Sequence, residues 1–301
     1  MKFLPTTKEE MKSLGWDSID VLLISGDTYL DTSYNGSALV GKWLVEHGFK
    51  VGIIAQPEVD VPDDITRLGE PNLFFAVSGG CVDSMVANYT ATKKRRQQDD
   101  FTPGGVNNKR PDRAVLVYSN MIRRFFKGTT KKIVISGIES SLRRITHYDY
   151  WTNKLRKPIL FDAKADILSY GMGEMSMLQL ANALKNGEDW KNIRGVCYLS
   201  KEIKEDYLSL PSHSECLADK DKFIEAFHTF YLNCDPITAK GLCQKCDDRY
   251  LIQNPPSESY SEEIMDKIYS MEFARDVHPY YKKMGTVRAL DTIKYSVTTH
   301  R

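Results

Sequence analysis

The stretch that decides the fold covers residues 131–149 and reads Lys-Lys-Ile-Val-Ile-Ser-Gly-Ile-Glu-Ser-Ser-Leu-Arg-Arg-Ile-Thr-His-Tyr-Asp. Its β-branched run at residues 133–135 ends at Ser136 and Gly137, and charged and hydroxylated side chains follow at once. A short buried strand that opens into polar residues is typical of α/β proteins, which place their chemistry at the carboxyl ends of strands. We therefore expect a strand at residues 132–136 and a functional loop after it.

Similar apolar runs recur before residue 200 and alternate with helical patterns. The predicted strands cover residues 19–25, 51–55, 72–77 and 165–170, with a short one at 196–199. The predicted helices between them cover about residues 35–47, 82–89, 112–128 and 175–185. Repeated strand–helix units predict an α/β fold with a doubly wound, mostly parallel sheet, a Rossmann variant like flavodoxin.

The regular alternation of predicted strands and helices ends near residue 200. An amphipathic helix is predicted at residues 219–231, an extended run at 249–253, and a further helix from Ser261. The alternation of Ile293, Tyr295 and Val297 predicts a strand over residues 291–301. We therefore expect a Rossmann-like domain at residues 1–200 and a mixed α+β region at residues 201–301.

Residues 91–112 interrupt the strand–helix rhythm with a polar segment rich in turn residues, which predicts an exposed insertion. The segment contains Lys93, Lys94, Arg95 and Arg96 in a row. Four consecutive basic residues suit a phosphate backbone. However, two aspartates follow closely and the one nearby aromatic, Phe101, is isolated, so we expect a solvated surface and no nucleic-acid partner.

The charge balance gives no general reason to expect nucleic acid or an anionic membrane as a partner. The 301 residues carry 41 Lys and Arg against 40 Asp and Glu, a net charge of +1. No apolar run approaches the roughly 20 residues needed to cross a bilayer, and residues 1–6 turn polar too early for a signal peptide. We therefore expect a cytoplasmic protein whose six cysteines are mostly unpaired.

Cys243 and Cys246 have the spacing of a metal-ligand pair. A zinc site usually shows two clear pairs, and only His213 with Cys216 could supply the second one. An incidental pair is therefore the favoured interpretation. The sequence also lacks both G-x-G-x-x-G and G-x-x-x-x-G-K-[ST], so a standard dinucleotide fingerprint and a P-loop are not expected.

The candidate site lies where four predicted strand ends meet, in the loops at residues 26–35, 78–81, 137–149 and 171–174. Its charged residues could form an acid–base or anion-binding set. Equally, Arg143 and Arg144 could pair with Glu139 and Asp149 only to hold the loop, and the sequence leaves both readings open. The candidate ligand-binding residues are Asp27, Tyr29, Asp31, Ser78, Asp83, Glu139, Ser140, Arg143, Arg144, His147, Asp149 and Glu174.

Several long motifs resemble the amino-terminal domain of YgiQ-type (UPF0313) radical SAM proteins. The hallmark is Ser-Gly-Ile-Glu-Ser-Ser-Leu-Arg-Arg-Ile-Thr-His-Tyr-Asp-Tyr-Trp at residues 136–151. Further segments that agree are Gly-Asp-Thr-Tyr-Leu-Asp at 26–31, Ser-Gly-Gly-Cys-Val-Asp-Ser-Met-Val-Ala-Asn-Tyr at 78–89, and Ala-Asp-Ile-Leu-Ser-Tyr-Gly-Met-Gly-Glu at 165–174. Downstream, residues 248–256 and 278–281 also fit, so the resemblance covers nearly the whole chain.

This resemblance implies a domain that precedes a radical SAM barrel, whose three-cysteine motif holds a 4Fe–4S cluster and leaves one iron open for S-adenosylmethionine. No C-x-x-x-C-x-x-C motif occurs among the six cysteines here. On its own the chain is therefore expected to bind no cluster and to be no enzyme, with residues 291–301 as the first strand of an incomplete barrel. It would present a substrate or cofactor to the barrel, for a reaction that is unassigned.

The resemblance also implies a Rossmann variant like the cobalamin-binding domains of related radical SAM enzymes. The alternative is therefore a stand-alone module that binds a cobalamin-like or nucleotide ligand in the crevice. The D-x-H-x-x-G motif of histidine-ligated cobalamin is missing, since Asp27 and Asp31 are followed two residues later by Tyr29 and Ser33. A mode of cobalamin binding without a protein ligand stays open.

Overall fold

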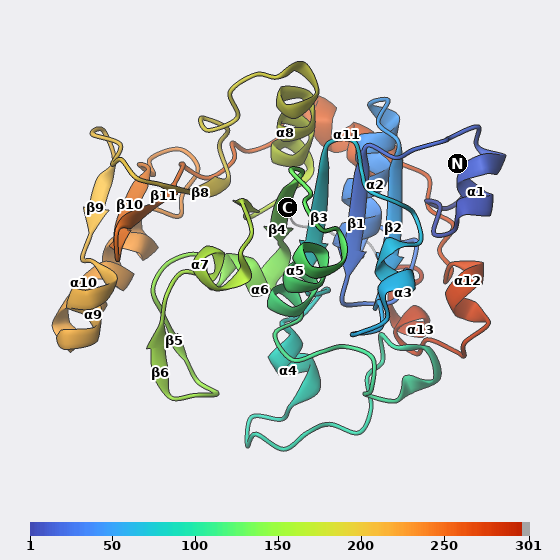
Figure 1. The fold of residues 1–301 in the computed structure, drawn as a ribbon, viewed down its shortest axis with the longest axis horizontal. Helices are drawn as coiled ribbons and strands as arrows, with labels where there is room; N and C mark the ends of the chain where they lie inside the picture. Colours follow the sequence, from blue (N-terminus) through green and yellow to red (C-terminus); the bar gives the residue numbers. More distant parts are fainter. Residues whose placement is uncertain (297–301) are drawn as a thin grey trace.

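The computed structural model describes residues 1–296, and its centre is a nine-stranded sheet with the order β2-β1-β3-β4-β7-β8-β11-β10-β9 (Figure 1). Its strands are β1 (Val21–Ser25), β2 (Val51–Ala55), β3 (Phe74–Ser78), β4 (Lys132–Ser136), β7 (Ile167–Ser169), β8 (Val196–Ser200), β9 (Leu208–Leu210), β10 (Leu242–Cys246) and β11 (Arg249–Gln253). A separate hairpin pairs β5 (His147–Asp149) with β6 (Lys154–Arg156). The α/β class and the mostly parallel sheet are confirmed.

Thirteen α-helices accompany these strands within residues 1–296. They are α1 (Lys8–Ser13), α2 (Gly36–Glu46), α3 (Pro62–Thr66), α4 (Ser84–Asn88), α5 (Ala114–Phe125), α6 (Gly137–Ser141), α7 (Ile159–Ala163), α8 (Glu174–Asn186), α9 (His213–Ala218), α10 (Lys220–Leu232), α11 (Glu262–Ser270), α12 (Pro279–Lys282) and α13 (Ala289–Ile293). None of them has the length and hydropathy needed to cross a bilayer.

The parallel part of the sheet places strand ends together. β1 pairs in parallel with both β2 and β3, and β3, β4 and β7 continue the parallel order. Because the chain moves from β1 to β2 on one side and then to β3 on the other, the strand order reverses at β1. In open α/β sheets, ligands bind beyond the carboxyl ends of strands at such a reversal.

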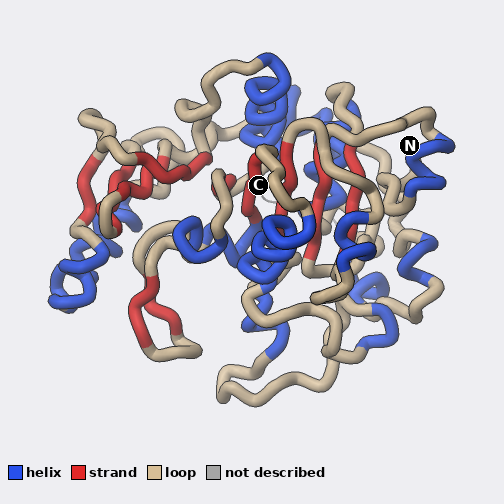
Figure 2. Tube along the Cα trace, viewed as in Figure 1, coloured by secondary structure: helices blue, strands red, loops and turns tan. Residues whose placement is uncertain are grey.

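Helices cover both faces of this parallel part (Figure 2). Successive strand residues point to opposite faces, so Leu23 lies in one core cluster while Leu22 and Ile24 lie in the other. α2 and α8 contact each other and contribute Trp43 and Met177 to the Leu23 cluster. α5 and α7 contact each other as well, and they pack against the opposite face.

The sheet continues through residue 200 without a break. β8 pairs antiparallel with both β7 and β11, β11 pairs antiparallel with β10, and β10 pairs in parallel with β9. The chain then returns to the α2 side, where Ile268 and Tyr281 share a core cluster with Leu4 and Trp43. The two regions expected at residues 1–200 and 201–301 therefore share one sheet and one core cluster.

The strand expected over residues 291–301 is wrong at its beginning, because residues 291–293 belong to α13. Ala289 and Ile293, four residues apart, are both buried, whereas Tyr295 is 73% exposed. The apolar spacing that decides the structure here is therefore helical, and the alternation toward Tyr295 does not select a sheet face. The last part of the expected strand, residues 297–301, lies outside the described residues.

Candidate functional site

A cavity of about 350 Å³ lies at the carboxyl edge of the parallel sheet. Three of its lining residues, Ser78, Ser136 and Ser169, are the last residues of the adjacent strands β3, β4 and β7. Ser78 and Ser136 also stand opposite each other in the strand register. This row of serines places hydroxyl groups at the edge of the cavity. The Ser78 hydroxyl accepts the Gly80 N–H at 3.2 Å, and the Ser169 hydroxyl shares a hydrogen bond with that of Ser176 at 2.9 Å.

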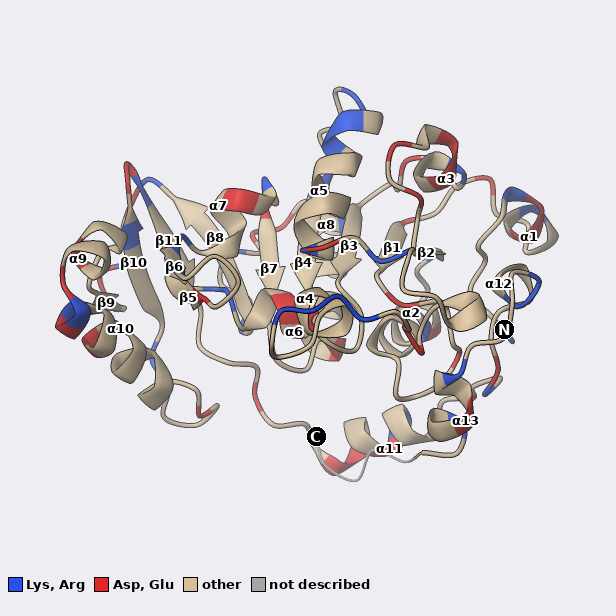
Figure 3. Ribbon diagram, turned by 90° about the horizontal axis from the view of Figure 1, so that it is seen from below, with Lys and Arg blue, Asp and Glu red and all other residues tan. Residues whose placement is uncertain are grey.

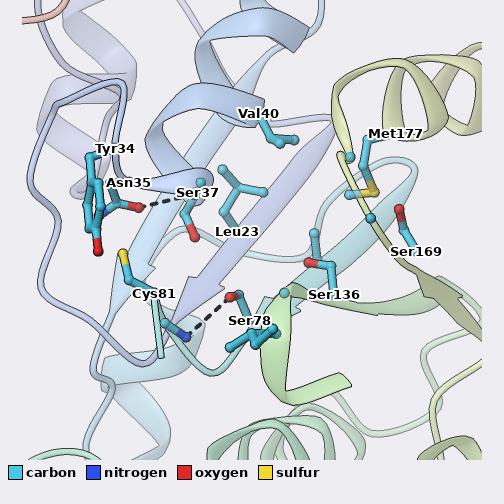
Figure 4. A pocket seen from close by; sticks show the side chains of 17 residues that line it. Leu23, Tyr34, Asn35, Ser37, Val40, Ser78, Cys81, Ser136, Ser169 and Met177 are labelled. Carbon is cyan, nitrogen blue, oxygen red and sulfur yellow. Dashed lines mark hydrogen bonds between the residues drawn. The ribbon is translucent and has the colours of Figure 1, made fainter. Parts of the chain in front are cut away.

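The remaining walls are mostly apolar (Figure 4). Leu23 and Ala76 from the sheet, Val40 from α2 and Met177 from α8 form them, and Tyr34 and Cys81 also line the cavity. None of the described residues that line the cavity carries a charged side chain. The arrangement suits an uncharged, partly apolar group with a polar edge, as small-molecule pockets generally do.

Glycine is required beside the cavity because the strand-end loops pack closely. Gly137 has a φ of +80°, and a Cβ there would lie 2.8 Å from Ser78 Oγ. Gly80 has a φ of +112°, and a Cβ there would lie 2.3 Å from an Asp27 carboxylate oxygen. Larger residues at these two positions would displace the loops that shape the cavity.

Asp27 belongs to a buried ion-pair group that corrects the expectation of an exposed insertion at residues 91–112. Residues 91–98 are exposed, but the Arg110 side chain is fully buried. Its guanidinium lies 2.6 Å from Asp27 and 3.1 Å from Asp99. The insertion is therefore anchored, because its residues Asp99 and Arg110 form a buried ion-pair group with Asp27 of the first strand-end loop.

This buried group also reaches Cys81 at the cavity wall. The Cys81 backbone N–H donates to Asp27 at 2.6 Å. Burial raises the pKa of Asp27, while the Arg110 charge opposes that rise. Burial, followed by the Asp27 charge, raises the pKa of the Cys81 thiol well above its usual value, so the thiol stays protonated and acts only as a weak donor.

Glu139 is buried behind the cavity and serves as a backbone acceptor. Its carboxylate accepts the N–H of Ser84 at 2.9 Å and the N–H of Val115 at 3.1 Å, which ties α6 to the first residues of α4 and α5. Burial raises the pKa of Glu139. The neighbouring Ser140 is buried as well, and its hydroxyl has no hydrogen-bond partner among the described residues.

The two arginines expected to pair with Glu139 and Asp149 have other partners. Arg143 forms an ion pair with Asp83, the N-cap residue of α4, and donates to the Glu139 carbonyl at 2.9 Å. Arg144 donates to the Gln253 side chain at 3.0 Å and lies 4.4 Å from the Tyr170 ring centroid.

His147 and Asp149 lie in β5, in the hairpin outside the main sheet. Asp149 forms an ion pair with Arg113 at 2.8 Å. Burial alone would raise the pKa of Asp149, but hydrogen bonds from Arg113 and Thr152 lower it to about 2. Burial lowers the pKa of His147 to about 4, so this imidazole is neutral at physiological pH.

Tyr29, Asp31 and Glu174 connect distant parts of the chain. The Tyr29 hydroxyl donates to Asp31 at 2.9 Å, and Asp31 forms an ion pair with Lys42 at 2.7 Å. Glu174 accepts a hydrogen bond from Tyr260 at 2.9 Å. The structure therefore brings only Ser78 of the twelve candidate residues into the cavity lining.

Sequence reasoning missed most of the residues that line the cavity. Ser37, Tyr34, Cys81, Ser136 and Ser169 were not among the candidates, although four strands of the parallel sheet, β1, β3, β4 and β7, each end in a serine. That recurrence is visible in the sequence. It is a better indicator of the cavity than the charged residues, which pair among themselves around it.

The pair Cys243 and Cys246 lies in strand β10. Residues three apart in a strand point to opposite faces, and Cys243 belongs to the core cluster on the Leu23 face. This geometry does not suit ligation of one zinc ion by both thiols. Within residues 1–296, no group of three or more His, Cys, Asp or Glu side chains is arranged to hold a metal ion.

Comparison with known proteins identifies the family to which this chain belongs. A UPF0313 protein of Fusobacterium nucleatum is 97% identical over 301 residues, which are 100% of this chain and 53% of that protein. A UPF0313 protein of Thermotoga neapolitana is 51% identical over 302 residues, covering 99% of this chain and 53% of that protein. The chain thus spans about half the length of these curated relatives.

Among solved structures, the radical S-adenosylmethionine methyltransferase TsrM from Kitasatospora setae, with cobalamin and a 4Fe–4S cluster bound, has a TM-score of 0.40 at 16% identity. The match covers 60% of this chain and 27% of that chain, a similarity too low to compare ligand sites. The model of the radical SAM N-terminal family matches residues 3–296, so the chain belongs to that family.

Proposed function

We propose that this chain is the amino-terminal, substrate- or cofactor-presenting domain of a radical SAM enzyme, and that it holds its ligand in the serine-lined cavity. The observation that carries the proposal is the position of the cavity. It lies at the carboxyl edge of β3, β4 and β7, near the reversal in strand order. The order β2-β1-β3-β4-β7 supports a flavodoxin-like arrangement.

The ligand class follows from the lining. The first amides of α2 are already used, because Asn35 accepts from the N–H groups of Ser37 and Ala38. The first turn of α8 carries Glu174, which disfavours an anion there. An apolar wall with serine hydroxyls at its edge therefore favours a flat heteroaromatic group, as in a cobalamin-like or nucleotide ligand, with any phosphate left outside.

The iron–sulfur cluster and S-adenosylmethionine are assigned to the rest of the full-length protein. The six cysteines of this chain are scattered, with Cys81 at the cavity, Cys197 in β8, Cys216 in α9 and the others around β10. A three-cysteine cluster site does not fit that distribution. The chain's own residues would bind and orient the ligand, and the cavity would exclude water from it.

An exposed apolar surface on α10 supports the proposal that the carboxyl-terminal half of the longer protein packs against this chain. Ala226 is buried and Phe230 packs against the core cluster that contains Leu22, yet the apolar arc of the helix continues through Phe227 and Tyr231, which are 54% and 67% exposed. A helix that is apolar on both sides is normally covered on both sides. We assign the second cover to the other half of the longer protein.

Titration of the purified chain with hydroxocobalamin, AMP and S-adenosylmethionine tests the proposed cavity. We expect one of them to bind by calorimetry and to raise the melting temperature, since a ligand at a hundredfold its Kd stabilises by about 2.7 kcal/mol. The variant Val40→Trp fills the cavity and should abolish binding. Val45→Trp, the same change on α2 but outside the lining, should bind normally.

Two results would count against the cavity as a ligand site. The first is no heat and no thermal shift with any of the three compounds. The second is binding that Val40→Trp leaves unchanged, since the ligand would then lie elsewhere.

A further inference from the structure

We propose that a second site on this chain binds single-stranded nucleic acid. This basic–aromatic surface consists of Tyr89, Lys93, Lys94, Arg95, Arg96, Tyr148, Tyr150 and Trp151. It joins the exposed loop at residues 91–98 to the β5–β6 hairpin. It is distinct from the cavity and does not depend on the proposed function. Two features of the sequence argue against a nucleic-acid partner, and the structure changes both.

The first feature is the isolation of the basic residues from aromatic ones. In the fold, the hairpin brings its aromatic residues to the loop. Lys93 Nζ lies 4.6 Å from the Tyr150 ring centroid and donates to the Trp151 carbonyl at 3.3 Å. The Tyr150 hydroxyl in turn donates to the Ala91 carbonyl at 2.7 Å. The loop and hairpin are therefore held together as one surface.

The aromatic rings of this surface lie next to one another. The Trp151 ring centroid is 5.3 Å from that of Tyr89 and 5.5 Å from that of Tyr150. Arg95 lies 5.6 Å from the Tyr89 ring centroid. Tyr148 and Tyr150 are each about half exposed. Cations and aromatic rings therefore lie together on this surface, and two of its tyrosines are half exposed.

The second feature is the pair of aspartates that follows the basic run. Asp99 is buried against Arg110, and Asp100 lies 3.4 Å from Arg288. Neither neutralises the loop. Asp112 pairs with Arg95 at 3.3 Å.

One further carboxylate, near the hairpin, leaves the basic loop unneutralised as well. Asp149 is buried and paired with Arg113. Among the described residues, Lys93, Lys94 and Arg96 have no carboxylate partner, and Lys and Arg form a continuous basic stretch in front of α4 and α6 (Figure 3).

This combination fits one chemical class best. Single-stranded nucleic acid is bound by cations that follow its phosphates and by aromatic rings on which its bases stack. An acidic peptide would need the cations but not the exposed rings. The surface also begins close to the cavity in the sequence. Only two loop residues and the short helix α4 separate Cys81, in the cavity wall, from Tyr89.

Fluorescence anisotropy with a labelled oligouridylate of about 15 nucleotides tests the site. We expect binding that weakens with salt, because each phosphate contact in a single strand contributes about −0.7 to the slope of log K against log salt. The double variant Lys93→Gln/Lys94→Gln should reduce that slope by about 1.4. The matched control Lys191→Gln/Lys201→Gln, two exposed lysines elsewhere, should leave it unchanged.

The aromatic variants separate nucleic acid from other polyanions. Tyr148→Leu and Tyr150→Leu should each weaken oligonucleotide binding about tenfold, since stacking contributes strongly per base, while heparin binding should stay the same. Tyr148→Leu should perturb the fold less than Tyr150→Leu. Among the described residues, the Tyr148 hydroxyl donates a hydrogen bond only to Asn153, within the hairpin. The melting temperature of every variant is measured alongside.

Three outcomes overturn the proposal. One is no oligonucleotide binding at low salt. Another is binding that the lysine double variant weakens no more than its control does. The third is equal binding of heparin, an acidic peptide and the oligonucleotide with no effect of either tyrosine variant, which would assign the surface to polyanions in general.

Discussion

Replacing Arg110 with methionine is expected to lower the free energy of unfolding by about 3–5 kcal/mol. Arg110 is the only cation beside Asp27 and Asp99 among the described residues, and all three side chains are almost completely buried. Methionine keeps much of the volume but leaves two carboxylates close together without a counter-charge. Urea denaturation monitored by circular dichroism measures the change.

The stability lost in Arg110→Met should depend on pH in a defined direction. Burial already raises the pKa of Asp27 above its unfolded value, and removal of Arg110 should raise it further. A carboxyl group with a raised pKa in the folded state binds protons more tightly when folded, so stability falls as the pH rises through that range. The deficit of Arg110→Met should therefore be largest near neutral pH and shrink as the pH approaches about 4.

The matched control is Arg95→Met in the same segment. Arg95 forms an exposed pair with Asp112, and such pairs contribute less than about 1 kcal/mol. Equal losses for the two variants, or a deficit in Arg110→Met that does not change with pH, would contradict the account of the buried group.

Replacing Lys42 with methionine should also lower the free energy of unfolding by about 3–5 kcal/mol. Lys42 is a buried cation on α2 that pairs with the buried Asp31 and donates to the Glu272 carbonyl at 2.6 Å. Asp31 also accepts the Ala274 N–H at 2.6 Å. The pair therefore joins the first βα unit to the returning segment at residues 271–278, and hydrogen exchange of that segment should accelerate in Lys42→Met.

A second substitution tests whether the charge itself is the cause. In Lys42→Met/Asp31→Asn the uncompensated carboxylate is removed, so part of the stability should return. Lys267→Met, which removes an exposed partner of Glu263, should cause no measurable change. If the double variant is less stable than Lys42→Met alone, the pair acts through packing and not through charge.

The parallel half of the fold could be predicted because each strand there is buried on both faces. β2 and β4 begin and end where the sequence predicts, since apolar runs bounded by Gly, Ser or Pro leave little choice. β9 and β10 were not predicted. Leu242–Cys246 includes Gln244 and Lys245, and its place in the sheet depends on pairing with β11 and β9.

The site was harder to predict because charge alone does not indicate exposure. Arg110, Asp27 and Glu139 are ionisable, yet they are buried and have partners that are distant in sequence. Conversely, the serines recur at the ends of the predicted strands, but only the register of the sheet shows that they lie side by side. The approach of the β5–β6 hairpin to residues 91–98 is likewise a tertiary contact that no local rule predicts.

In the proposed arrangement, this chain presents its cavity to a carboxyl-terminal half. Hydroxyl-radical footprinting tests it most directly, by comparing this chain with the full-length Fusobacterium relative. Tyr34 in the cavity lining and Tyr231 on α10 are 45% and 67% exposed here. We predict slower modification of both in the longer protein, with Tyr148 unchanged. Equal modification of Tyr34 and Tyr231 in the two proteins would contradict the account.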